Sequence, residues 1–407
     1  MVVSGLKIRV KLTKLKEFDI KLSQTKKVLY IAPFSQKLLG AEESDIRSGV
    51  QILQTFKKIY IYTAFINLES GQIYFNDQSA TQLLKSSLLD RVNFYMHYFS
   101  SPDYTLRQGF TFKNFLIIKN LCKNLNINIV ITNTTSTFLF GRQKKIRHVH
   151  RSVAFEPVYC LKAVSNPVKA FFHSIVKILT VFKELQAHTI LSISPRDKKY
   201  YSFAKKIFFK RTHLMVMPLR QFYYSNKVKH NLDLTSDLKI AFLGSTYNVL
   251  HNKKSLYFIL QSIDFNFLSI NKFTLNLYGS KFPSNIETSQ NIIINSWIDN
   301  INEVYEVNHC FLVPYFLNSG MQSKVFEPLI MGRILICDTR SISGYDFEPF
   351  EHFIPAKNEL DFRNGLKWII ENPNRALKIA ENARIRASEI IGKQAIVEQT
   401  RKCLTFY

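Results

Sequence analysis

Cysteine is scarce in this 407-residue sequence, and long apolar runs are missing. The five cysteines are scattered without a Cys-x-x-Cys pair, which argues against a disulfide framework or a zinc site and favours a reducing compartment. No apolar stretch reaches the roughly 18 residues that a membrane-spanning helix needs, and the N-terminal residues lack the apolar segment of a signal peptide. We therefore expect a cytoplasmic protein that binds no metal.

Acidic residues are also few. The sequence has 55 Lys and Arg but only 30 Asp and Glu, which gives a formal net charge of +25. Basic residues concentrate at 1–27 and at 198–229, where aromatic side chains lie between them. Such charge attracts nucleotide-sugars, anionic lipid headgroups or nucleic acid. The aromatic pattern favours an anionic membrane surface as partner, although it is also compatible with a solvated basic face. No helix-turn-helix, zinc-finger or RNP signature is present, so we expect no nucleic-acid partner.

The length and an apolar content of 46% predict two domains. The first begins with a strand at 28–34, a helix at 47–56 and a strand at 58–65. In the second, short apolar runs alternate with segments long enough for helices, as a parallel doubly wound sheet requires. The predicted parts are a basic arm (1–27), an N-terminal acceptor-binding domain (28–220), a linker (221–237), a C-terminal nucleotide-sugar-binding domain (238–385) and a C-terminal helix that we expect to cross back to the first domain (386–407).

Residues 319–338, SGMQSKVFEPLIMGRILICD, carry the most informative pattern. Ser319 and Gly320 can leave backbone N–H groups free at the start of a helix, where the helix dipole favours an anion. Lys324 and Glu327 lie three apart and share one face of this helix. Gly332 ends the helix, and an apolar run then predicts a buried strand.

The spacing Lys324-x-x-Glu327-x-x-x-x-Gly332, followed by an apolar strand, resembles the nucleotide-sugar-binding signature of GT-B glycosyltransferases. The likeness is to their retaining group 1 type, which is family 4-like. In that family a second glutamate precedes this one, and Ser319 stands in its place here. The resemblance implies an α/β fold of the GT-B type, with two Rossmann-like doubly wound domains facing a central cleft.

The resemblance covers residues 238–395 best and places several residues at the donor. The segment that begins GSTYNVLHN is similar to the family loop beside the donor diphosphate, and a Trp beside the nucleotide base suits stacking. Each of these residues also has an explanation that needs no ligand. Gly244 can let a helix end approach the strand closely, Lys253 and Lys254 can lie in solvent at the start of a helix, and the Trp can pack in the core. The residues expected to bind the nucleotide-sugar are Gly244, Ser245, Lys253, Lys254, Trp297, Ser319, Gly320 and Met321.

Two histidines mark the acceptor side. His148 and His150 alternate on a predicted strand and point to the same face, with Glu156 beyond its end. The resemblance places a histidine here beside the reacting sugar, which favours His150, with His148 as the second choice. Both could instead satisfy local backbone hydrogen bonds. Glu156 and Gly40, in the loop after the first strand, are assigned to the acceptor side.

The predicted catalytic residues are His150, Lys324 and Glu327. Breaking a sugar–diphosphate bond leaves negative charge on the phosphate, which fixed cations and helix-end N–H groups stabilise. Lys324 and the backbone at 319–320 take this role, and the resemblance gives Glu327 the donor hydroxyls. No Asp-x-Asp motif occurs, which fits the metal-independent type. The donor is expected to be a UDP- or GDP-sugar, and no cofactor is expected.

The resemblance therefore predicts a hexosyltransferase-type enzyme, and retention of the anomeric configuration is what the family implies. The enzyme would extend a capsule, O-antigen or other lipid-linked saccharide in a bacterium, at the inner face of the cell membrane as a peripheral protein. An alternative is a catalytically inactive GT-B protein that binds sugars or serves assembly, since Ser319 replaces an acidic residue. An epimerase or phosphorylase on the same fold is a further alternative.

Overall fold

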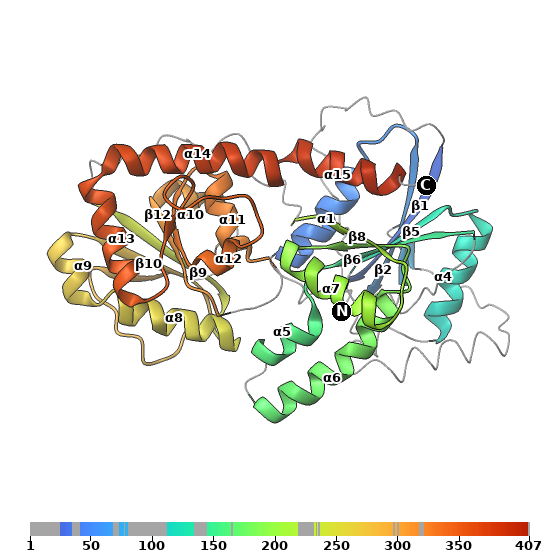
Figure 1. The fold of residues 1–407 in the computed structure, drawn as a ribbon, viewed down its shortest axis with the longest axis horizontal. Helices are drawn as coiled ribbons and strands as arrows, with labels where there is room; N and C mark the ends of the chain where they lie inside the picture. Colours follow the sequence, from blue (N-terminus) through green and yellow to red (C-terminus); the bar gives the residue numbers. More distant parts are fainter. Residues whose placement is uncertain are drawn as a thin grey trace, which may run out of the picture.

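The computed structural model places two α/β units next to each other (Figure 1). Residues 1–24 and most of the predicted linker lie outside the part of the chain that it describes. The described residues are 25–34, 41–67, 73–76, 78–79, 112–133, 145–163, 166–218, 232, 234, 237–295, 298, 301–316 and 321–405.

The first unit is built on an eight-stranded sheet with the strand order β4-β3-β2-β1-β5-β6-β7-β8. Its strands pair in parallel, except for β3 and β4, which extend one edge in antiparallel pairing. The central strands are buried on both faces, which is why they read as apolar runs in the sequence. The strands are β1 (Lys26–Phe34), β2 (Ile59–Asn67), β3 (Ile73–Phe75), β4 (Gln78–Ser79), β5 (Ile129–Asn133), β6 (Arg147–Ser152), β7 (Thr189–Ser192) and β8 (His213–Val216).

Helices cover both faces of this sheet, and alternate residues of β1 show the division. Tyr30 packs in the cluster that includes α1, whereas its neighbour Ile31 packs in the cluster that includes α4. Helices α6 and α7 pack against β7, since their buried side chains form one apolar cluster with Ile190 of β7. The short α5 precedes α6 in the chain. The bounds are α1 (Ala41–Leu53), α4 (Phe112–Asn124), α5 (Glu156–Ala163), α6 (Pro167–Glu184) and α7 (Pro195–Ile207).

The second unit has a fully parallel six-stranded sheet with the order β11-β10-β9-β12-β13-β14. The predicted fold class is confirmed by these two parallel-based sheets with their crossover helices. The elements are β9 (Lys239–Thr246), α8 (Leu250–Ser262), α9 (Phe265–Asn271), β10 (Thr274–Ser280), β11 (Ile292–Asn295), α10 (Ile301–Val307), β12 (Cys310–Val313), α11 (Ser323–Ile330), β13 (Ile334–Cys337), α12 (Thr339–Ile342), β14 (Ile354–Pro355) and α13 (Glu359–Glu371).

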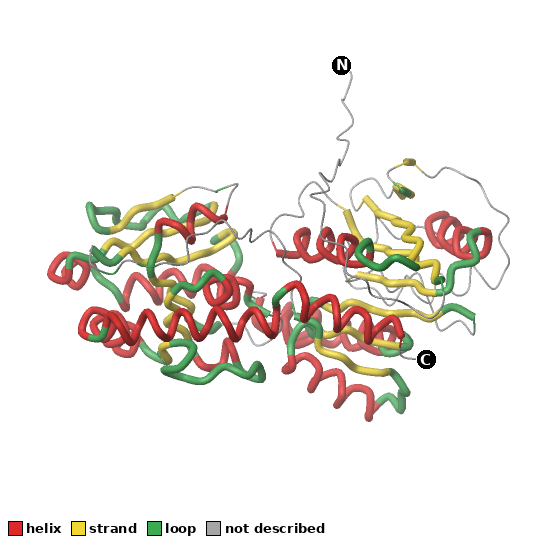
Figure 2. Tube along the Cα trace, turned by 90° about the horizontal axis from the view of Figure 1, so that it is seen from above, coloured by secondary structure: helices red, strands yellow, loops and turns green. Residues whose placement is uncertain are grey.

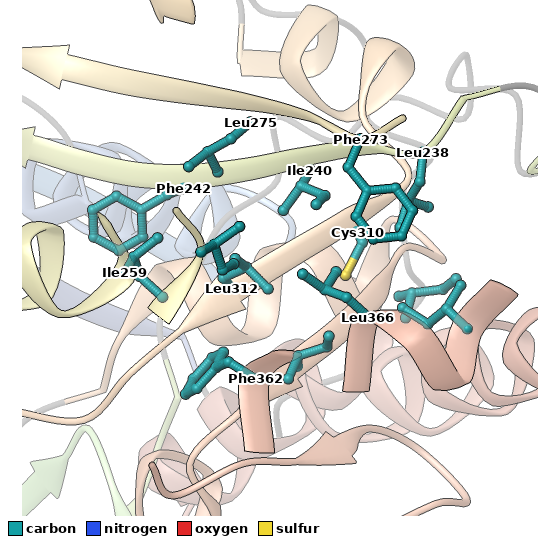
Figure 3. Close-up of a cluster of buried hydrophobic side chains, with 14 of the residues drawn as sticks. Leu238, Ile240, Phe242, Ile259, Phe273, Leu275, Cys310, Leu312, Phe362 and Leu366 are labelled. Carbon is teal, nitrogen blue, oxygen red and sulfur yellow. The ribbon is translucent and has the colours of Figure 1, made fainter. Parts of the chain in front are cut away.

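One of the two apolar clusters of the second unit lies between this sheet and helices α8 and α13 (Figure 3), and the other includes residues of α10, α11 and α14 (Pro373–Ile391). In the first of these clusters Phe242 and Ile240 from β9 meet Leu312 from β12, and Phe362 of α13 closes the cluster. All four side chains are essentially inaccessible to solvent. Burial of this apolar surface stabilises the sheet that carries the candidate site.

One helical segment joins the two units along one edge of the molecule (Figures 1 and 2). Helix α14 (Pro373–Ile391) packs Ala383 and Ala387 into the second unit, and α15 (Lys393–Thr405) packs Ile396 into the first. At their junction a Cβ on Gly392 would lie 2.0 Å from the carbonyl oxygen of Ser388. Glycine is therefore required for the chain to continue directly from one helix into the next.

A second contact between the units brings the carboxyl ends of their strands together. Arg196, in the first turn of α7, and Arg340, after β13, lie over the ring of Tyr315, with centroid distances of 5.1 and 5.2 Å. Arg196 also donates to the Arg340 carbonyl at 2.5 Å. The Tyr345 hydroxyl donates to the carbonyl of Ile193 at 2.7 Å, directly after β7. The loops that follow the strands of the two sheets therefore face each other.

Candidate functional site

Lys324 is the most unusual charged residue at this edge of the second sheet. It lies in the first turn of α11, half-buried, with its ammonium 5.5 Å from the ring centroid of Phe242. Burial lowers the pKa of Lys324 to about 8. Within the part of the chain that the structure describes, no carboxylate pairs with it. A desolvated cation without a counter-ion favours binding of an anion, and the aromatic face offsets only part of the desolvation.

Three buried polar atoms near the start of α8 and α11 also have no hydrogen-bond partner among the described residues. They are Thr246 Oγ1 at the end of β9, His251 Nδ1 in the first turn of α8, and Gln322 Oε1 at the N-cap position of α11. Buried polar atoms in proteins are nearly always hydrogen-bonded, so each of these atoms is a candidate contact for a polar ligand, as is Asn133 Oδ1 in the first unit. Burial, and then the charge of Lys324, lowers the pKa of His251 to about 4, so its imidazole is neutral at pH 7.

None of these three residues was predicted from the sequence. Thr246 and His251 lie in the segment GSTYNVLHN, which the resemblance had already placed at the donor diphosphate. The neighbouring Lys253 and Lys254 were predicted instead, because a positive charge suits a diphosphate. A threonine and a histidine at the end of a strand and the start of a helix were the available signal, but only the three-dimensional structure shows that they are buried and unpaired.

The two strand-end glycines make room for a tyrosine. A Cβ on Gly244 would lie 2.6 Å from the ring of Tyr247, and one on Gly279 would lie 2.2 Å from the carbonyl oxygen of Gly244. Gly279 also has φ +145°, which side chains rarely adopt. The Tyr247 hydroxyl then donates to the carbonyl of Tyr278 at 2.9 Å. Local packing thus accounts for both glycines, and a role of Gly244 in ligand binding stays a prediction.

The remaining predicted donor residues do not all gather at Lys324. Lys253 and Lys254 are exposed on α8, and the Lys253 ammonium lies 5.9 Å from the Tyr257 ring centroid on the same helix. Ser245 is the last residue but one of β9, and its carbonyl accepts from the Ser280 hydroxyl at 2.9 Å. Met321 packs half-buried against the core. The predicted residues Trp297, Ser319, Gly320 and Gly40 lie outside the described residues.

Glu327 points from the same helix toward α10. One of its carboxylate oxygens accepts a hydrogen bond of 2.6 Å from the hydroxyl of Tyr305. The other oxygen has no hydrogen-bond partner among the described residues. Pro328 lies inside α11 and lacks an N–H, so the carbonyl of Lys324 loses its usual helical donor. The helix tolerates this proline because it begins only five residues earlier.

The predicted acceptor-side histidines share one face of β6, as their spacing predicts. Both lie against the hydroxyl oxygen of Thr132, His148 Nε2 at 2.8 Å and His150 Nδ1 at 3.2 Å. Both are buried, and burial lowers the pKa of His148 to about 3. His150 Nε2 also lies 3.4 Å from a carboxylate oxygen of Glu184. The side chains of Thr132 and Glu184, rather than local backbone groups, are therefore the contacts of His150.

Other charged groups at the edge of the first sheet form ion pairs. Glu156, at the start of α5, pairs with Lys177 of α6. Arg151 of β6 and Asp45 of α1 form a bidentate pair at 3.1 and 3.2 Å, and both side chains are fully buried. Arg151 also donates to the carbonyl of Pro218 at 3.0 Å. The sequence analysis missed this pair, because its members lie 106 residues apart.

The described residues contain no group of three His, Cys, Asp or Glu side chains that could hold a metal ion. None of the helices in this part of the chain combines the length and the apolar character that crossing a lipid bilayer requires.

Comparison of the sequence with protein-family models and with curated proteins finds no match. Comparison of the structure with solved structures does find matches. Sucrose-phosphate synthase from Thermosynechococcus elongatus is 12% identical with a TM-score of 0.61, and the match covers 93% of this chain and 98% of that one. The chain has the GT-B fold.

Two further GT-B structures match over nearly their whole length. A glycosyltransferase from Rickettsia africae ESF-5 is 13% identical with a TM-score of 0.59, and the match covers 94% of this chain and all of that one. The HepE protein of Anabaena, solved in complex with UDP and glucose, is 10% identical with a TM-score of 0.59 and the same coverage. At these identities the likeness concerns the fold.

Proposed function

We propose that this GT-B protein is a glycosyltransferase that moves a sugar from a UDP- or GDP-sugar to a glycan acceptor. The observation that carries the proposal is the desolvated ammonium of Lys324 together with two unpartnered buried atoms: His251 Nδ1, on an imidazole whose pKa the charge of Lys324 helps to lower, and Gln322 Oε1, at the start of the same helix as Lys324. Together they form a site for an anion that also carries hydroxyl groups. The complex of the structurally similar HepE protein with UDP and glucose supports this choice of ligand.

In the proposed reaction the bond between the sugar C1 and a phosphate oxygen breaks, and its electron pair remains on the phosphate. The ammonium of Lys324 stabilises this charge, and it needs no reorganisation because α11 holds it in place. The hydroxyl of Thr246 and the neutral imidazole of His251 can donate hydrogen bonds to the same group. The acceptor hydroxyl oxygen forms the new bond to C1, and its proton passes to the phosphate oxygen that leaves.

Other side chains of the site orient the sugar in this proposal. The free carboxylate oxygen of Glu327 accepts from donor hydroxyls, while Tyr305 fixes the other oxygen. Gln322 Oε1 offers a further acceptor. His150 is proposed to contact the reacting sugar, held in place by Thr132 and Glu184. Retention of anomeric configuration and independence from metal follow from the sequence resemblance.

The proposed acceptor is a surface glycan of the capsule or O-antigen kind, or another lipid-linked saccharide, at the inner face of a bacterial membrane. The formal net charge of +25 supports association with an anionic membrane surface. The structurally similar TarM protein was solved with UDP and saccharide ligands, and the match spans 59% of that longer chain.

The test is transfer of labelled sugar from a panel of UDP- and GDP-sugars to glycolipids extracted from bacterial membranes. We expect one donor to give a labelled lipid with wild-type protein and none with Lys324→Met. Lys254→Met is the matched control, because Lys254 is exposed, and it should keep full activity. Equal transfer by wild type and Lys324→Met would contradict the assigned site, and no transfer from any donor would contradict the function.

A further inference from the structure

The first three turns of α6 expose a continuous row of large apolar side chains. They are spaced i, i+3, i+4, i+7 and i+10, which places them on one side of the helix. The opposite side is occupied, because Ala170, Ser174 and Lys177 are buried toward α5. The exposed residues, with 44% to 62% of their surface accessible, form what we call the α6 stripe: Val168, Phe171, Phe172, Ile175 and Ile178.

Residues at the N-terminus of α6 favour the start of a regular helix. Asn166 caps α6 by accepting from the backbone N–H of Lys169 at 3.0 Å, and Pro167 occupies the first turn, where its missing N–H costs nothing. Single exposed apolar residues are common on proteins, and Ile270 on α9 is one here. Five on one helix face form a contiguous patch of the kind that marks an interaction surface.

The charge around the α6 stripe selects the partner. Helix α7 lies beside α6, with the rings of Phe182 and Phe208 5.2 Å apart. Lys169 of α6 and Lys198, Lys199 and Lys206 of α7 are exposed. Lys177 and Lys183 of α6 are buried, as are the only acids of the two helices, Glu184 and Asp197. Glu156 of neighbouring α5 is paired with Lys177. An apolar row beside uncompensated positive charge fits an anionic lipid surface, whereas a second copy of the same face would be repelled.

The position of α6 relative to the candidate site is consistent with a lipid-linked acceptor. Helix α5 lies between them, since it packs against α6 and its Tyr159 ring is 6.4 Å from the imidazole of His251. In Figure 1, α5 and α6 form the edge of the molecule opposite the long α14–α15 segment. A membrane docked on α6 would therefore lie on the side of the candidate site.

From the sequence, the interleaved basic and aromatic residues of 198–229 suit a membrane interface or a solvated face, and the apolar helix of 168–186 suits either a core or a lipid contact. Tyr201 of the first of these segments is fully buried, where its hydroxyl donates to Glu184 at 2.6 Å. Phe203 of α7 and Phe209, two residues after the end of α7, are exposed. The basic side chains of α7 add charge next to α6, but the continuous apolar row belongs to α6.

We propose that the α6 stripe docks the protein on anionic lipid bilayers, with Phe171 and Phe172 inserted among the lipid headgroups and acyl chains and with Lys169 and the exposed lysines of α7 facing the lipid phosphates. This deepens the membrane part of the proposed function. Vesicle binding needs neither donor nor turnover, so its failure and the failure of the transferase proposal are separate results.

The test is flotation of the full chain with vesicles of phosphatidylcholine containing 30% phosphatidylglycerol, compared with vesicles of pure phosphatidylcholine. We expect binding to the anionic vesicles that weakens at high salt, since part of the attraction is electrostatic. The double variant Phe171→Ser/Phe172→Ser should lower the vesicle partition coefficient roughly tenfold or more, because it removes two large apolar side chains from the contact.

The control is Ile270→Ser, which removes an even more exposed apolar residue from α9 and should bind as wild type. Thermal unfolding should be unchanged in both variants, since all three side chains are exposed. The proposal is overturned if the wild type does not float, if the double variant floats like the wild type, or if Ile270→Ser loses binding equally. It is also overturned if the wild type binds no vesicles and forms a dimer that Phe171→Ser/Phe172→Ser dissociates.

Discussion

The carboxyl-terminal edges of the two sheets differ in how their buried charged side chains are compensated. In the first unit Arg151 pairs with Asp45, and His150 Nε2 lies 3.4 Å from a Glu184 oxygen, while Asn133 Oδ1 there has no hydrogen-bond partner among the described residues. In the second unit Lys324 has no carboxylate partner among the described residues, and His251 has an unpartnered buried nitrogen. A buried pair holds the fold together, whereas a buried group without a partner lowers stability unless a ligand completes it. The comparison locates the proposed donor site in the second unit.

The largest expected effect comes from breaking a pair in the first unit. Asp45→Ala leaves the Arg151 guanidinium buried without a counter-ion, which should lower the free energy of unfolding by about 3 to 5 kcal/mol. Urea denaturation measures this loss. Asp346→Ala is the control, because Asp346 pairs with Arg386 on the surface. Its cost should stay below about 1 kcal/mol. Equal losses in the two variants would remove the distinction between buried and exposed pairs.

Lys324→Met should give the opposite result in the second unit. The substitution removes a desolvated charge, so the unliganded protein should be as stable as the wild type or more stable. The stabilisation by bound nucleotide, about 2.7 kcal/mol at one hundred times the wild-type dissociation constant, should fall to about 1.4 kcal/mol or less at the same nucleotide concentration. Thermal unfolding with and without UDP or GDP measures both effects. A variant that unfolds more easily yet keeps the nucleotide shift would mean that Lys324 is structural.

Acid should destabilise the first unit through His148. Its pKa is about 3 in the folded chain, against 6.5 as the ordinary value, so the unfolded chain binds the extra proton first. The contribution of neutral His148 to the free energy of unfolding is therefore complete above pH 6.5. It falls as the pH decreases toward 3, by up to about 1.4 kcal/mol per pH unit. Denaturation at pH 7, 6 and 5 measures the slope. His148→Gln should flatten it, and an unchanged slope would exclude this histidine as the cause.

The smallest expected effect concerns Glu327. Glu327→Gln replaces the charged acceptor of the Tyr305 hydroxyl with a neutral one, which should lower stability by about 1 kcal/mol. Glu327→Gln should also lower the transfer activity, because the carboxylate is proposed to bind donor hydroxyls. Tyr305→Phe removes only the hydrogen bond and serves as the comparison. If both variants lose stability but keep full activity, Glu327 has a structural role alone.

The regular strands of the second unit could be predicted because parallel strands buried on both faces are apolar throughout, as β12 and β13 are. Helix α1 was predicted at 47–56 but occupies Ala41–Leu53. Its first turn is polar and acidic, which suits a helix start without adding to the apolar period. Periodicity therefore located the core elements better than their ends.

The candidate site was predicted only in part, since pairing is a property of three-dimensional structure. Lys324 was found from its spacing to Glu327 and Gly332. That Lys253 is exposed while His251, two residues away, faces Lys324 depends on the orientation of α8. The pair of Arg151 with Asp45 joins distant parts of the chain, and no local pattern marks it.

The most direct test is calorimetric titration of the wild type and Lys324→Met with UDP and with GDP at pH 7 and pH 9. One nucleotide should bind the wild type, and its affinity should fall at pH 9, because the pKa of Lys324 is about 8 and its charge is lost. Lys324→Met should bind roughly tenfold or more weakly, a loss of about 1.4 kcal/mol or more, without this pH dependence. If neither nucleotide binds, or if the variant binds as tightly as the wild type at pH 7, Lys324 does not form a nucleotide-sugar site.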